Sequence, residues 1–157
     1  MEFMTLKLIF KQLFGAILAC FSAFSLAQEV QVDDGFVRAM PPTVPNSAAY
    51  MTLKNPGKDK VLVGVRTQAA KEAQLHTLIE EQGMVKMRQV SEFSLPAEGE
   101  LVLAPSGDHI MLLGLTQPLK EGEEVGLTLI FADESEQLIS LPVRKGASQN
   151  HHHHHHH

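Results

Sequence analysis

Short stretches of strand-forming residues, broken about every ten residues by turn-forming residues, most constrain what this chain can fold into. Strand-like runs include Val61–Arg66, Met84–Val90 and Val125–Phe131. Turn sequences include Asn55-Pro56-Gly57 and Pro105-Ser106-Gly107. This pattern favours an all-β sandwich or barrel over βαβ units, and it predicts eight or nine strands.

Three segments are expected to interrupt the strands. Gln68–Ala73 is weakly helical in pattern, and Asp33-Asp34-Gly35 is expected to be a turn between two short strands. Prolines at positions 41, 42 and 45 predict a loop over residues 40–47, because proline cannot donate a backbone hydrogen bond to a sheet.

Residues 1–27 are expected to be a cloning scar followed by a secretory signal peptide. Lys7 and Lys11 provide the positive start, and Leu13–Leu26 is apolar and uncharged. That segment is shorter than the roughly 20 residues needed to span a bilayer. We expect cleavage after Ala27, which would place the mature chain in the periplasm.

Two alternatives to a cleaved signal remain open, namely an uncleaved anchor and lipid attachment at Cys20. Cys20 is the only cysteine of the chain. If it leaves with the signal peptide, the mature chain has no disulfide, no thiolate ligand and no cysteine nucleophile.

The remaining chain is expected to be a single β-sandwich domain over residues 28–146, followed by a polar tail and tag over residues 147–157. Of the 13 basic and 18 acidic residues in the whole chain, Lys7, Lys11 and Glu2 lie before residue 28, which leaves a net charge of −6. An acidic domain without a basic patch argues against nucleic acid as a partner.

Two histidines and two methionines form a candidate metal site. Seven of the nine histidines belong to the terminal run that resembles a purification tag, which leaves His76 and His109. His109 and Met111 are two residues apart, so they share one face of a strand. A hairpin turn centred on Glu81-Gln82 would place His76 directly opposite Met87 on one face. Spacing by itself does not bring the two pairs together.

The donor chemistry of this set favours Cu(I). Thioether sulfur is a soft ligand and imidazole is borderline, whereas zinc prefers thiolate, imidazole and carboxylate. A blue-copper site needs a cysteine. Structural roles remain open at this point, because methionines on strands often pack in cores. Among the other methionines, Met40 is the best placed to assist a site, whereas Met51 and Met84 are expected to be packing or loop residues.

The spacing of these four residues resembles the metal-binding motif of the PCuAC family of periplasmic copper chaperones. The surrounding sequence is also similar to that family at Val37–Pro42, Asn46–Tyr50 and Ala104–Leu112. Phe36 departs from it, since relatives often carry tryptophan there. The C-terminal tail lacks the additional histidines and methionines of some relatives.

The resemblance implies a cupredoxin-like Greek-key β-sandwich that binds one Cu(I) ion. Its ligands would be His76, Met87, His109 and Met111. It further implies a monomeric, non-enzymatic chaperone that delivers copper to the CuA subunit of cytochrome c oxidase, alongside a Sco-type protein. The alternatives are copper storage or detoxification without targeted delivery, a copper redox enzyme, and a metal-free β-sandwich interaction module.

Overall fold

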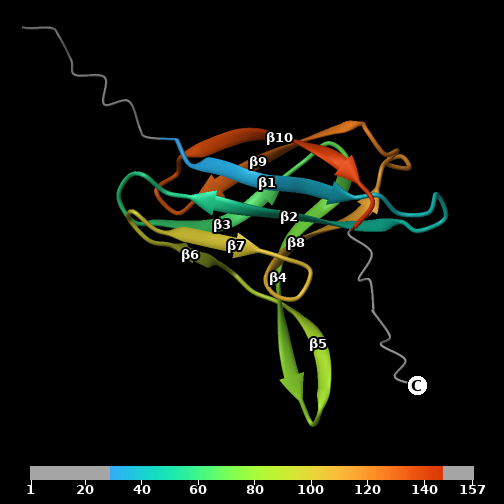
Figure 1. The fold of residues 1–157 in the computed structure, drawn as a ribbon, viewed down its shortest axis with the longest axis horizontal. Helices are drawn as coiled ribbons and strands as arrows, with labels where there is room; N and C mark the ends of the chain where they lie inside the picture. The colour runs from blue at the N-terminus through green and yellow to red at the C-terminus, as the bar shows by residue number, and fades with distance from the viewer. Residues whose placement is uncertain (1–28, 147–157) are drawn as a thin grey trace, which may run out of the picture.

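A computed structural model describes residues 29–146, which form ten strands and no helix (Figure 1). The strands are β1 (Gln31–Arg38), β2 (Asn46–Lys54), β3 (Lys60–Arg66), β4 (Ala70–Glu81), β5 (Met84–Gln89), β6 (Phe93–Leu95), β7 (Glu100–Leu103), β8 (His109–Leu115), β9 (Glu124–Phe131) and β10 (Glu136–Arg144). The expected signal peptide and the tag lie outside the described residues. Within the described range, no helix could cross a membrane. The all-β prediction is confirmed, with ten strands instead of eight or nine.

The strands form one mixed sheet that folds over on itself as a sandwich (Figure 1). One half has the order β5-β4-β8-β2-β1, with β7 also paired to β2, and the other has the order β10-β9-β3-β6. β1 joins the halves by running parallel to β10, with Val37 opposite Val143. The chain crosses repeatedly between the halves, so the expected Greek-key β-sandwich is confirmed.

The core lies between the two halves, because alternate residues of each strand point inward. Ile110 and Leu112 of β8 and Leu127 and Leu129 of β9 are all 0% exposed and belong to one hydrophobic cluster. The opposite face of β8 therefore carries His109 and the residues at even spacing from it. Because Ile110 and Leu112 are buried in the core, the side chain of His109 must lie on the opposite face of β8.

The β4–β5 hairpin projects from the body of the sandwich (Figure 1). Every residue of β5 is exposed, and β5 forms one edge of the sheet. The prediction of weak helix over Gln68–Ala73 is wrong, because β4 begins at Ala70 and pairs with β8 from Ala70 opposite Leu115 onward. Pairing with a neighbouring strand outweighs a weak local preference.

The expected turn at Asp33-Asp34-Gly35 is instead an irregularity within a single strand, β1. The register against β2 shifts between Asp33 and Phe36, and Asp34 has a φ of 49°. A Cβ added at Gly35 would collide with the side chain of Leu141 in the core. Glycine at this position therefore leaves room for the Leu141 side chain where β1 approaches β10.

We predict that Gly35→Ala destabilises the fold by about 1–3 kcal/mol, the usual cost of forcing extra volume into a packed core. Urea denaturation followed by circular dichroism would measure it. Gly64→Ala is the matched control in β3, because its Cβ would lie 3.8 Å from the Ile130 side chain, an ordinary contact. An equal loss of unfolding free energy in both variants would show that contact with Leu141 is not the reason for glycine at position 35.

Candidate metal centre

The β4–β5 hairpin brings Met87 to the same face of the sheet as His76, but not directly opposite it. The structure pairs His76 with Gln89 and Leu78 with Met87. The predicted direct pairing of His76 with Met87 is therefore wrong by two residues. Side chains alternate with a period of two, so a shift of two leaves Met87 on the predicted face. Diagonal neighbours on one face remain within reach of a long side chain.

The turn chemistry explains this difference in register. Gln82 and Gly83 both have positive φ, 54° and 75°, the combination found in a two-residue type I′ turn. Such a turn follows the right-handed twist of the flanking strands. The hairpin is consequently centred between Gln82 and Gly83 instead of between Glu81 and Gln82, and β4 extends to Glu81, which pairs with Met84.

Pairing of β4 with β8 joins the two halves of the predicted set. His76 lies directly opposite His109, and Met111 lies opposite Gln74. The His76 and His109 ring centroids are 5.7 Å apart, with the rings inclined by 55°. All four predicted residues therefore lie on one face of three adjacent strands, β5, β4 and β8.

Three of the four predicted residues line a hollow of about 240 Å³ on this face, namely Met87, His109 and Met111. His76 is not among the lining residues, and it joins the set through its ring, which lies against His109. Tyr50 forms part of the same wall, with its ring centroid 6.3 Å from that of His109. The hollow thus places the sulfur atoms of both predicted methionine ligands next to a histidine pair.

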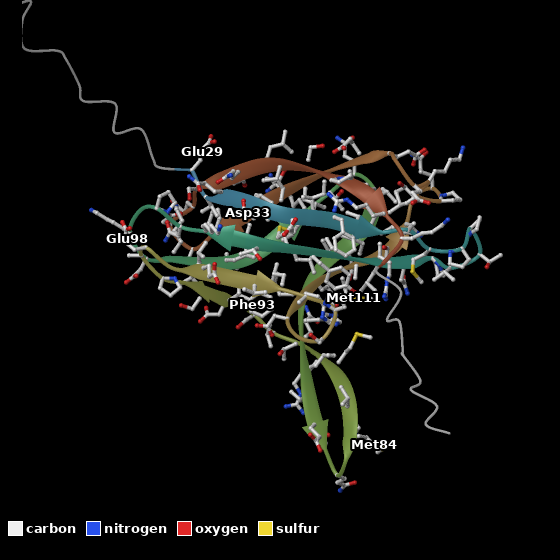
Figure 2. All side chains as sticks on the ribbon, viewed as in Figure 1. Glu29, Asp33, Met84, Phe93, Glu98 and Met111 are labelled. Atoms are coloured by element: carbon white, nitrogen blue, oxygen red, sulfur yellow. The ribbon has the colours of Figure 1, made fainter. Side chains whose placement is uncertain are left out.

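The other methionines separate clearly by position. Met40 lines the same hollow, where it adds a third thioether. Met51 is buried in the core at 2% exposure. Met84 lies near the tip of the hairpin, far along it from Met111 at its base (Figure 2). Met40 is therefore the one of these three that lies beside the predicted ligands.

The two imidazoles have different hydrogen-bond environments. The Nδ1 atom of His109 lies 2.9 Å from the carbonyl oxygen of Gly107 and donates to it, because a carbonyl oxygen only accepts. The Nε2 atom of His109 then carries the lone pair. The Nδ1 atom of His76 is buried and has no hydrogen-bond partner. A buried nitrogen without a partner is costly, and a metal ion would satisfy it.

The environment of His76 keeps its imidazole neutral. Burial lowers the pKa of His76 below its ordinary value of 6.5, and repulsion from His109 lowers the pKa further. A neutral imidazole is the form that binds metals. Within residues 29–146, no three His, Cys, Asp or Glu side chains gather as a metal site. The four predicted ligands at this face offer imidazole and thioether donors, which suit a soft ion.

Sequence reasoning did not single out Gln74, Leu78 or Tyr50. The alternation of β4 could have found Gln74 and Leu78, since each is two residues from His76. Tyr50 belongs to β2, and only the pairing of β2 with β8 brings it beside His109.

We predict that the imidazole of His76 titrates with a midpoint below 6.5 in the metal-free, tag-free protein. The folded protein then binds fewer protons than the unfolded chain below that pH, so His76 stabilises the fold above about pH 6.5 and this contribution is lost as the pH falls. NMR titration of the His76 ring protons would measure the pKa. A midpoint at or above 6.5 would contradict the burial of this ring.

A family profile described as "Putative lipoprotein LpqE-like" matches residues 30–143. The chain is 37% identical to "Putative lipoprotein Lxx21020" of Leifsonia xyli subsp. xyli over 129 residues, covering 80% of this chain and 76% of that protein.

Solved structures show a similar fold. The Cu(I) form of DR1885 from Deinococcus radiodurans is 39% identical, with a TM-score of 0.61, covering 82% of this chain and 87% of that one. The copper-bound PCuAC domain of PmoF2 is 18% identical, with a TM-score of 0.62, covering 76% of this chain and 96% of that one, and this likeness concerns the fold alone. The expected cupredoxin-like fold is confirmed.

Proposed function

Because this chain belongs to the LpqE-like/PCuAC family, we propose that it binds one Cu(I) ion on the face formed by β4, β5 and β8. The observation that carries the proposal is the buried, unpartnered Nδ1 of His76, whose ring lies against His109 at the edge of a hollow lined by Met87, Met111 and Met40. The 39% identical DR1885 has been solved as a Cu(I) complex.

The proposed ligands are His76, Met87, His109 and Met111. Support comes from their common face and from the chemistry of two thioethers and two neutral imidazoles, which favours Cu(I) over zinc. A copper-thiolate centre would need a cysteine, and residues 29–146 hold none. Four neutral ligands leave the ion its positive charge, so a stronger ligand set in a partner can withdraw it.

The exposure of the ligands is graded, which supports a role in transfer. His109 is 4% exposed, Met111 is half-buried and Met87 is 61% exposed on the edge strand β5. An incoming ligand would meet Met87 first and could replace its sulfur while the histidines still hold the ion. We therefore propose binding and release of copper instead of catalysis, since thioethers favour Cu(I) over redox cycling.

We further propose that the mature chain acts as a monomer in the periplasm and delivers copper for assembly of the CuA centre of cytochrome c oxidase, alongside a Sco-type protein. The support is the family membership together with the exposed side of the site. Storage or detoxification without delivery uses the same ligands, and only a transfer experiment separates it from delivery.

We predict that tag-free protein binds one equivalent of Cu(I) in competition with a chelator, and that Met87→Ala, His109→Ala and Met111→Ala each weaken this binding. Loss of a direct ligand should weaken the Cu(I) affinity by more than the roughly 10–100-fold that is typical when a hydrogen-bond partner of a ligand is removed. The tag must be removed, because His151–His157 would bind metal independently. Met84→Ala is the matched control on the same strand, where the side chain is 55% exposed. Unchanged Cu(I) affinity in all three ligand variants would contradict the proposed site.

For delivery, we predict that the Cu(I)-loaded protein transfers its ion to an apo CuA domain on mixing. Separation of the two proteins, followed by copper analysis of each, would measure the transfer. Retention of copper by the loaded protein would point to storage.

A further inference from the structure

We infer that Gln74 is a positioning residue that holds His76 in one tautomer, so that His76 presents Nδ1 to the metal while His109 presents Nε2. This inference rests on the proposed function, because it specifies how the two imidazoles meet the copper ion. It assigns different nitrogen atoms to the two histidines, together with a hydrogen-bonded chain that fixes the choice.

The chain of hydrogen bonds runs along one face of β4. Glu72, Gln74 and His76 are two residues apart, so their side chains share a face. The Gln74 side-chain amide donates from Nε2 to the Glu72 carboxylate at 2.8 Å. The Oε1 atom of Gln74 lies 2.9 Å from Nε2 of His76.

Donor and acceptor rules fix the protons along this chain. A carboxylate only accepts, so the NH₂ group of the Gln74 amide must face Glu72 and its carbonyl oxygen must face His76. That oxygen also only accepts, so the Nε2 atom of His76 carries the proton. The lone pair of a neutral imidazole must then reside on Nδ1, the buried atom without a partner.

His109 has the opposite arrangement. The Gly107 carbonyl accepts from Nδ1 of His109, which leaves the lone pair on Nε2. Outer hydrogen-bond partners of this kind set the tautomer and orientation of metal-binding imidazoles in general. The partner of His109 is a backbone carbonyl, whereas the partner of His76 is a side chain. Substitution can therefore remove only the hydrogen bond that sets the tautomer of His76.

Gln74 is held in place from two sides, which makes it suited to this role. Glu72 orients its amide, and pairing with β8 places Gln74 opposite Met111. The residue thus neighbours the imidazole that it orients along β4 and faces the proposed ligand Met111 on β8. Gln89 lies opposite His76 on β5 but is not its hydrogen-bond partner.

Nitrogen-15 NMR of the tag-free protein tests this inference before any copper is added. The expected spectrum shows the Nε2–H tautomer for His76 and the Nδ1–H tautomer for His109. On addition of Cu(I), the resonance that shifts most should be Nδ1 for His76 and Nε2 for His109. Gln74→Leu should give a tautomer mixture at His76 and weaken Cu(I) binding by about 10–100-fold, as loss of an outer partner does elsewhere.

Two variants separate positioning from general packing. Gln89→Leu makes the same substitution on the neighbouring strand β5, directly opposite His76, and should preserve both the tautomer and the affinity. Gln74→Glu keeps an acceptor for Nε2–H and should preserve the tautomer that Gln74→Leu loses. The Nδ1–H tautomer at His76 in the wild-type protein, or an unchanged tautomer and affinity in Gln74→Leu, would overturn the inference. Failure of the wild-type protein to bind Cu(I) would overturn the proposed function instead. The spectrum of the copper-free protein would still show which tautomer His76 adopts.

Discussion

The antiparallel pairing of β4 with β8 is the contact on which the candidate site depends. It places His76 directly opposite His109, with ring centroids 5.7 Å apart, although 32 positions separate them in the chain. The inward faces of the same strands carry Leu75 and Ile110, which are paired with each other and buried in the core. Burial of this apolar pair therefore sets the register that brings the histidines together.

The site combines a buried side with a more accessible side. His109 lies against the packed body of the sandwich, whereas Met87 lies on an edge strand in which every residue is exposed. Edge strands lack one row of backbone partners, so they are accessible and less constrained. A soft ion held in this way would be anchored by imidazole on one side and open to exchange on the other. That division supports the proposed release of copper.

Predictions from local pattern succeeded where one face of a strand decides the outcome. The alternation around Ile110 correctly placed His109 and Met111 on one face, because burial of Ile110 leaves its neighbours no other side. The hairpin register failed by two residues, since the choice between turns depends on backbone angles at Gln82 and Gly83. The prediction that Met87 lies on the same face as His76 is still correct, because a shift of two residues is one full period of side-chain alternation in a strand.

The sequence by itself determined the all-β class, the soft donor set and the shared face of each pair of residues, since composition and a period of two are local properties. The tertiary structure decided that the two pairs meet, that Tyr50 and Met40 border the same hollow, and that Gln89 rather than Met87 lies directly opposite His76. These contacts depend on which strands become neighbours. That choice follows from burying the whole core at once, which no single stretch of the chain encodes.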